Sequence, residues 1–363
     1  MFTLLCLAYV VFAKKYIVTS YHNTNEDYIV IPQPDEYKYE ELHDSHVIGD
    51  FKFEVIESED FPVNAFTNKN VIDIEEDRTD WSINGYSTQE NPTWGLDRID
   101  QRINKLDKKY HYSSGAGSKS TVYVLDTGID VNHPEFEGRA KWGYDVTGDG
   151  QKNLHPHGTH CAGTIASKTY GVAKKATVVA VRVLGSDGSG STSGIIAAIE
   201  WVVKQSTKNK VASMSLGGGV SQALNNAVAQ ASKKGVIFVV AAGNENQNAC
   251  DTSPASEPSA ITVGATDLDT KIAYFSNWGK CVNIFGPGVD ILSTVPGNRT
   301  DTMSGTSMAT PHVAGVVALM INDAKSYTPE QVKNFLVKVS SKDKITGNLQ
   351  GSPNSLVFSL SSL

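Results

Sequence analysis

From Trp94 onward the sequence alternates apolar runs with amphipathic runs, and this alternation limits the possible folds more than any other feature. Nearly continuous apolar runs at 121–129 (TVYVLDTGI) and 176–184 (ATVVAVRVL) predict strands that are buried on both faces. Helical patterns at 194–204 (GIIAAIEWVVK) and 222–234 lie between runs of this kind. Apolar strands separated by helices indicate an α/β fold, with a mostly parallel sheet covered by helices on both faces.

The segment that precedes this pattern differs in charge. Residues 14–86 hold 17 acidic and 6 basic residues, a net charge of -11, whereas the whole chain carries -7, so the remainder is net positive. Strand-like runs occur at 15–21 (KYIVTSY), 47–56 (VIGDFKFEVI) and 70–77 (NVIDIEED), with a helical stretch near Glu40. We therefore expect a small α+β domain that is electrostatically complementary to the rest of the chain.

The flanks of this acidic segment predict how it is delivered and removed. Residues 1–13 (MFTLLCLAYVVFA) form an apolar run that is too short to span a bilayer and ends in small residues, as a secretory signal peptide does. Residues 78–93 are polar and rich in turn formers, which predicts an exposed, cleavable linker. The expected organisation is a signal peptide at 1–13, an inhibitory prodomain at 14–86 and a peptidase domain at 87–363, with no membrane span.

Three side chains that could perform acyl transfer stand at the ends of predicted elements. Asp126 closes a strand, His157 opens a helix of small residues, and Ser307 precedes a buried helix in which Pro311 is expected in the first turn. Each alone is more often a cap or a turn residue. Together they supply a nucleophile, a base and a carboxylate that orients the base. Asn244, after another strand, could donate to the oxyanion.

The predicted signal peptide implies an oxidising compartment, which determines how the cysteines are expected to pair. Removal of the signal peptide would remove Cys6 and leave Cys161, Cys250 and Cys281. One pair and one free thiol are then expected. We pair Cys250 with Cys281, because both lie in polar, loop-like surroundings.

Five motifs give the chain a resemblance to the subtilisin superfamily, to its proteinase K branch, and most of all to cerevisin-like fungal vacuolar proteases. They are DTG at 126–128, HGTHCAG at 157–163, SLGGG at 215–219, AAGN at 241–244 and GTSMATPHVAG at 305–315. The resemblance covers roughly residues 92–357, and residues 14–80 resemble the family's prodomain more weakly. It also implies the pairing of Cys250 with Cys281, and a free thiol at Cys161 beside the catalytic histidine.

The resemblance implies a role for each matching residue. Asp126, His157 and Ser307 would form the catalytic triad, and Asn244 would serve the oxyanion. The peptide clamp would be Gly188, Ser189, Gly190, Ser215, Leu216 and Gly217, and one wall of the specificity pocket would be Ala241, Ala242 and Gly243. Small apolar walls, with no acidic residue in these motifs, imply cleavage after large apolar or aromatic residues. One departure is Pro156, where relatives usually have glycine.

The metal content is left open by the sequence. Catalysis of this kind needs no cofactor, but the resemblance implies a structural calcium site made of two carbonyls and an aspartate. The matching positions are Pro258, Ala260 and Asn283. Asparagine in place of aspartate removes a charge from a site for a hard cation. A second calcium position of the family matches Arg102, which argues against that site.

The expected protein is a monomeric serine endopeptidase of the secretory pathway, either extracellular, at the cell surface or vacuolar. It would be made as a self-processing zymogen, cut near Tyr86-Ser87, and inhibited by its own prodomain. Its partners would be polypeptides and not nucleic acid. A kexin-like processor is disfavoured, because no pocket for paired basic residues is evident and the chain ends at Leu363. A non-catalytic binding protein is disfavoured by the intact triad.

Overall fold

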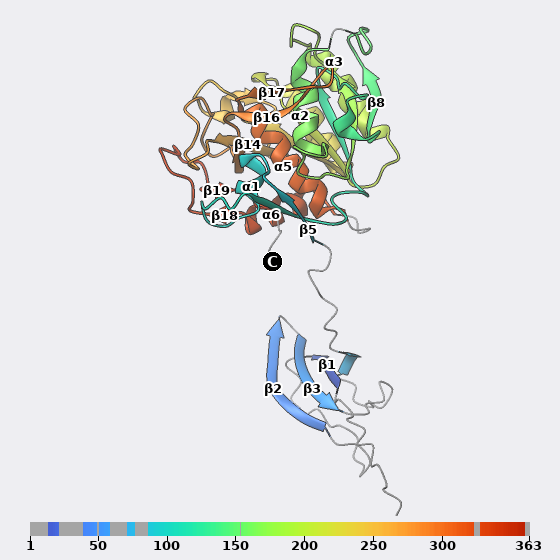
Figure 1. The fold of residues 1–363 in the computed structure, drawn as a ribbon, viewed down its shortest axis with the longest axis vertical. Coiled ribbons are helices and arrows are strands. Elements are labelled where there is room, and N and C mark those ends of the chain that lie inside the picture. The colour runs from blue at the N-terminus through green and yellow to red at the C-terminus, as the bar shows by residue number, and fades with distance from the viewer. Residues whose placement is uncertain are drawn as a thin grey trace, which may run out of the picture. The chain divides into compact units, whose positions relative to one another are not determined.

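The computed structural model describes residues 14–21, 39–48, 51–58, 71–76, 86–152, 154–322 and 327–359. The chain divides into two compact units, residues 1–84 and residues 85–363, which Figure 1 shows in blue and in the remaining colours. The signal peptide expected at residues 1–13 lies outside the described residues and stays a prediction. No helix among the described residues combines the length and apolar character that crossing a bilayer requires.

The described part of the first unit is an antiparallel sheet with the strand order β2-β3-β1-β4. Its strands are β1 (Lys14–Tyr21), β2 (Tyr39–Ile48), β3 (Phe51–Ser58) and β4 (Val71–Glu76). The helix expected near Glu40 is wrong, because this stretch is part of β2 and pairs with β3 from Tyr39 opposite Ser58 to Ile48 opposite Phe51. The run expected as one strand at 47–56 is likewise divided between β2 and β3. Long-range pairing here overrides the local helical pattern.

The second unit is built on a sheet that is almost entirely parallel, which confirms the expected α/β fold. Among the described residues its strands run, in spatial order, β18 (Ser341–Lys342), β19 (Ser355–Leu356), β15 (Ile284–Pro287), β14 (Ile261–Thr266), β12 (Val236–Ala241), β10 (Lys210–Met214), β7 (Thr121–Asp126), β9 (Thr177–Arg182) and β8 (Ala140–Asp145). Only the β18–β19 pair is antiparallel. Parallel neighbours place the carboxyl ends of β7, β9, β10 and β12 at one edge, where ligands of such sheets usually bind.

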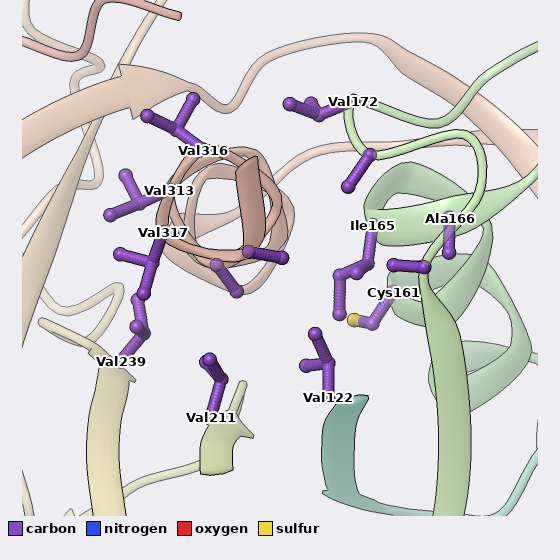
Figure 2. Close-up of a cluster of buried hydrophobic side chains, with 14 of the residues drawn as sticks. Val122, Cys161, Ile165, Ala166, Val172, Val211, Val239, Val313, Val316 and Val317 are labelled. Carbon is purple, nitrogen blue, oxygen red and sulfur yellow. The ribbon is translucent and has the colours of Figure 1, made fainter. Parts of the chain in front are cut away.

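Helices cover both faces of this sheet. They are α1 (Trp94–Ile99), α2 (Pro156–Ala166), α3 (Thr192–Lys204), α4 (Gln222–Lys233), α5 (Thr306–Met320) and α6 (Pro329–Val339). In β7, Val122 and Val124 face the apolar cluster of α2 and α5, while Tyr123 and Leu125 face the cluster of α3 and α4. Figure 2 shows the first cluster, where valines of α5 meet Val239 and Val211 of the sheet. Burial on both faces explains why the strands are apolar throughout.

The ends of several helices follow from their local sequence. Helix α6 begins with the expected capping box, in which Thr328 and Gln331 exchange side-chain and backbone hydrogen bonds. Helix α5 begins at Thr306, so Ser307 lies in its first turn and Pro311 lies inside the helix. The expectation that Pro311 occupies the first turn is therefore wrong. The helix starts before its long apolar run because the segment from Thr306 is itself buried against the sheet.

Shorter strands complete the unit. Strand β5 (Tyr86–Glu90) pairs with β6 (Lys109–Ser113), β11 (Gly218–Gly219) with β13 (Thr252–Ser253), and β16 (Ile291–Val295) with β17 (Arg299–Met303). The linker expected at 78–93 is therefore wrong for residues 86–90, which are a paired strand. Pairing with β6 orders a polar segment whose composition alone resembles a loop.

Candidate active site

Asp126 lies at the carboxyl end of β7 and is completely buried. The amide of Thr127 donates to its Oδ1 at 2.7 Å. The amides of Val183 and Leu184 donate to its main-chain carbonyl, so the segment directly after β9 fixes its backbone. These hydrogen bonds therefore hold the carboxylate in one orientation at the carboxyl end of the strand.

The start of α2 is pressed against this strand end. The Thr127 hydroxyl donates to the carbonyl of His155 at 3.0 Å and accepts from the amide of Gly158 at 3.0 Å. A Cβ on Gly158 would lie 2.2 Å from the Gly128 carbonyl oxygen, so only glycine permits this approach. Pro156 is the first helical residue, where its fixed φ suits the helix and its missing amide costs little.

His157 is brought onto Asp126 by this packing. Its Nδ1 lies 2.8 Å from Oδ1 and 2.9 Å from Oδ2 of the carboxylate. Burial lowers the pKa of His157, but the Asp126 carboxylate and the Cys161 sulfur together outweigh burial, and the pKa is raised well above its usual value. A hydrogen bond from Nδ1 to the carboxylate leaves Nε2 as the nitrogen that can accept a proton.

Ser307 lies across the cleft, and it exchanges hydrogen bonds with Ser215 just beyond the end of β10. Its hydroxyl donates to the Ser215 carbonyl at 3.2 Å, and the Ser215 hydroxyl donates to the Ser307 carbonyl at 2.8 Å. Pro311 has no amide to donate to that carbonyl, which a regular helix would pair four residues on. Ser215 and the Cys161 thiol, at 3.4 Å, satisfy it instead. Both are far from Ser307 in sequence.

The structure brings Ser307 and His157 to the same cleft, which both residues line. Among the hydrogen bonds of the described residues, none joins the Ser307 hydroxyl to His157. That hydroxyl is directed to the Ser215 carbonyl. To bond to Nε2 of His157 instead, the hydroxyl would have to give up this donation to Ser215. Such bonds commonly tighten only when substrate is bound.

Asn244 follows β12 and is oriented by the residue that precedes Ser307. Its Oδ1 accepts from the amide of Thr306 at 2.8 Å and from the Thr306 hydroxyl at 3.0 Å. With the oxygen held in this way, the amide Nδ2 is the group left to donate toward the cleft. Ser307 lies in the first turn of α5, where backbone amides lack intrahelical acceptors. Two donors are thus available beside the serine hydroxyl.

Two adjoining hollows meet at Ser307. The larger has a volume of about 550 Å³, and the predicted clamp residues all line it: Gly188, Ser189, Gly190, Ser215, Leu216 and Gly217. The smaller has a volume of about 300 Å³ and is lined by the predicted pocket residues Ala241, Ala242 and Gly243 together with Asn244. The segment from Leu216 to Gly219 borders both. An extended chain in the first hollow could therefore place one side chain in the second.

The smaller hollow also has acidic residues on its wall, which the motifs do not contain. Glu245 and Asp251 both line it. The Glu245 carboxylate accepts hydrogen bonds from the backbone N–H of Asn244 and from the Asn277 side chain, each at 2.9 Å. The expectation of a wall without acidic residues is therefore incomplete. Glu245 directly follows the AAGN motif, so its position next to Asn244 was the available signal.

Sequence reasoning also missed three supporting groups. Thr127 clamps α2, Thr306 orients Asn244, and the Ser215 hydroxyl holds the Ser307 carbonyl. The two threonines stand next to a triad candidate within the DTG and GTS motifs, which was their only sequence signal. Ser215 was expected at the peptide clamp, but its side-chain contact could not be read from sequence.

The cysteines are arranged as expected. Cys250 and Cys281 form a disulfide that joins the segment after β12 to the segment before β15, and Cys161 is free and buried. The Cys161 sulfur lies 4.0 Å from Nδ1 of His157. The thiol is thus in direct contact with the candidate base.

Comparison with known proteins gives consistent matches. The model of the subtilase family matches residues 117–352. A cuticle-degrading serine protease of Arthrobotrys oligospora is 47% identical over 77% of this chain and 71% of its own length. Cerevisin of Saccharomyces cerevisiae is also 47% identical, over 75% of this chain and 47% of its own length. Because these identities are equal, the expected special likeness to cerevisin is not supported.

A solved structure agrees with the fold. The crystal structure of a cold adapted subtilisin-like serine proteinase matches with a TM-score of 0.72 and 47% sequence identity. The match covers 75% of this chain and 99% of that chain.

Proposed function

Because this chain belongs to the subtilase family of serine endopeptidases, we propose that Asp126, His157 and Ser307 are its catalytic triad. The observation that carries the proposal is the buried Asp126 carboxylate, bonded at 2.8 Å to Nδ1 of a histidine that shares a cleft with Ser307. A catalytic triad needs this orientation of the base, because Nε2 must face the serine. The family requires no cofactor for catalysis.

The proposed reaction begins when Nε2 of His157 accepts the Ser307 hydroxyl proton as the oxygen attacks a peptide carbonyl. The carbonyl carbon becomes tetrahedral, and its oxygen becomes an anion that accepts hydrogen bonds from Asn244 Nδ2 and the Ser307 amide. Asp126 stabilises the imidazolium that forms. His157 then gives its proton to the departing amine, which leaves an acyl-enzyme at Ser307.

The second half repeats these roles with water. His157 takes a proton from water, and the oxygen attacks the acyl carbon to form a second tetrahedral anion in the same donor pair. Collapse releases the carboxylic acid, and His157 returns the proton to Ser307. Three groups set the geometry for both halves of the reaction. Thr127 positions the base, Ser215 positions the nucleophile and Thr306 positions Asn244.

Substrate binding is proposed to use both hollows. The glycine-rich edge at 188–190 and the edge at 215–217 would bind an extended peptide through main-chain hydrogen bonds, which tolerate many sequences. The small buried walls Ala241 and Ala242 favour a large apolar or aromatic side chain before the cut bond. Peptides that differ only in that residue test this preference. A faster reaction with lysine than with phenylalanine would instead assign the selecting role to the acidic wall.

We also propose that the chain is a secreted or vacuolar zymogen. Residues 14–86 would be an inhibitory prodomain, residues 1–13 a signal peptide, and the bond cut in maturation would lie near Tyr86-Ser87. That bond is inside β5, where Tyr86 pairs with Ser113 of β6. The strand must therefore leave its partner before the bond can enter the cleft. The disulfide and the relatives support a secretory route.

The first experiment compares expressed wild type with Ser307→Ala by N-terminal sequencing, intact mass and labelling with a fluorophosphonate. Wild type should begin near Ser87 and be labelled, whereas Ser307→Ala should keep its acidic segment and stay unlabelled. Ser304→Ala is the matched control, since this exposed serine lies in the same approach to the helix and should behave as wild type. Normal peptidase activity in purified Ser307→Ala would reject the proposed nucleophile. An unlabelled wild type would favour a binding protein.

A further inference from the structure

Lys333 on α6 holds two carbonyl groups of a distant loop. Its ammonium Nζ lies 2.8 Å from the carbonyl oxygen of Pro258 and 2.9 Å from that of Ala260. Both carbonyls belong to the segment that leads into β14. Burial lowers the pKa of Lys333, and the nearby Glu257 opposes that shift. Two converging carbonyl oxygens form a cation site, and here the cation is a side chain of the same chain.

These carbonyls are the ones that the family resemblance assigns to a structural calcium ion, so their fit to calcium can be tested. Calcium takes six to eight oxygen ligands and prefers carboxylates among them. The third matching residue, Asn283, supplies no charge. Its side-chain oxygen already accepts from the backbone N–H of Thr262 at 2.8 Å, and its backbone N–H donates to the Thr262 carbonyl. The donor set is therefore neutral and already paired, and it does not fit calcium.

The second position that the resemblance connects with calcium is also filled by a cationic side chain. Arg102 donates from Nη1 to the carbonyl of Val339 at 2.5 Å, and its guanidinium carbon lies 3.7 Å from the centre of the Phe358 ring. Val339 is the last residue of α6, where a positive charge complements the helix dipole. At both matching positions, backbone carbonyls are thus paired with a side-chain cation.

We propose that the Lys333 ammonium takes the place of a structural calcium ion in this protein and ties α6 to the segment between β13 and β14. The segment matters to the cleft, because Ser253 of β13 pairs with Gly218 of β11 and lines the larger hollow. The hydrogen bonds of Lys333 hold the segment that follows β13, and so they support this edge of the cleft. The edge that binds substrate therefore keeps its shape without calcium at this position.

The test measures the thermal midpoint of the full chain in excess calcium chloride and in excess EDTA, in a Ser307→Ala background that prevents self-digestion. Lys333→Met removes the cation and leaves two carbonyls unpaired, so Tm should fall by about 3–5 °C. Lys338→Met is the matched control, because Lys338 is exposed on the same helix, and it should change Tm by less than about 1 °C. Lys333→Arg keeps the charge and should retain most of the Tm.

The double variant Lys333→Met with Asn283→Asp tests the replacement directly. It frees the two carbonyls and adds a carboxylate, so its Tm should be several degrees higher in calcium than in EDTA. The Tm of the protein without these two substitutions should be the same in calcium and in EDTA. The proposal is overturned if Lys333→Met and Lys338→Met have the same Tm. It is also overturned if calcium raises the Tm of wild type as much as that of the double variant. Should Lys333→Met not accumulate, the double variant refolded in calcium and Lys333→Arg still decide between these outcomes.

Discussion

The hydrogen bond from Ser215 to the carbonyl of Ser307 tests how the proposed nucleophile is positioned. Ser215→Ala removes a donor at 2.8 Å from a carbonyl that Pro311 cannot serve. Only the weaker thiol contact from Cys161, at 3.4 Å, would remain. The first turn of α5 should then shift or fluctuate, and Ser307 moves with it.

The size of the effect follows from the group left unpaired. A partly buried carbonyl that loses its hydrogen bond costs about 1–2 kcal/mol. Expressed entirely in the transition state, this equals a decrease of roughly 5–30-fold in kcat. KM should change by less than about 2-fold, because the backbone of Ser215 remains at the peptide edge. Ser213→Ala is the matched control, since this buried hydroxyl in β10 has no hydrogen-bond partner among the described residues. It should leave kcat unchanged.

A second change supplies the missing donor by another route. Pro311→Ala restores a backbone amide four residues after Ser307, where a regular helix would pair it with the Ser307 carbonyl. The double variant Ser215→Ala with Pro311→Ala should recover most of the lost kcat. The assay is peptide hydrolysis, with the concentration of active enzyme set by fluorophosphonate titration. The reasoning is refuted if the double variant is no faster than Ser215→Ala, or if Ser213→Ala is equally slow.

Three other changes give separate predictions. Asp126 and, after it, Cys161 raise the pKa of His157 against the effect of burial, so kcat/KM should fall as pH drops through a pKa above the usual value of about 6.5. Asp126→Asn should move that limb to lower pH and reduce kcat by roughly 10³–10⁴-fold. An unmoved limb in the pH profile would contradict this. Replacing Cys250 and Cys281 by serine should lower the free energy of unfolding by about 3–4 kcal/mol in denaturant titrations. The reason is that the disulfide closes a loop of 31 residues and so restricts the unfolded chain. An unchanged midpoint would argue against stabilisation by this restriction. Gly158→Ala places a Cβ 2.2 Å from the Gly128 carbonyl oxygen, so α2 should move off β7. The kcat of the active-site-titrated enzyme should then fall by up to about 10²-fold, and an unchanged kcat would show that this close approach does not position His157.

Much of the second unit could be predicted because its sequence is locally consistent. Val122 to Leu125 alternate between two apolar faces, and such a strand must be buried on both sides. The capping box at Thr328 marks the start of α6 through contacts between residues three apart. The order of Asp126, His157 and Ser307 at element ends likewise indicated the chemistry before any distance was known.

Tertiary structure decided what local sequence left open. The stretch near Glu40 has a helical pattern but is strand β2, and residues 86–90 have the composition of a loop but form β5, because each finds a partner strand. Strand pairing is a contact between distant segments, and its free energy can exceed a local preference.

The motifs could be found in the sequence, but the contacts that position their side chains could not, because these contacts also join distant segments. Ser215 is 92 residues from Ser307, and Lys333 is 75 residues from Pro258. Each forms a short hydrogen bond that depends on which strands and helices are neighbours. The sequence by itself determined most strands and helices of the second unit and their order, and it singled out the candidate catalytic side chains, since these follow from short-range patterns. Only the tertiary structure determined which distant groups hold those side chains in place, because a single hydrogen bond has no periodic pattern in the sequence.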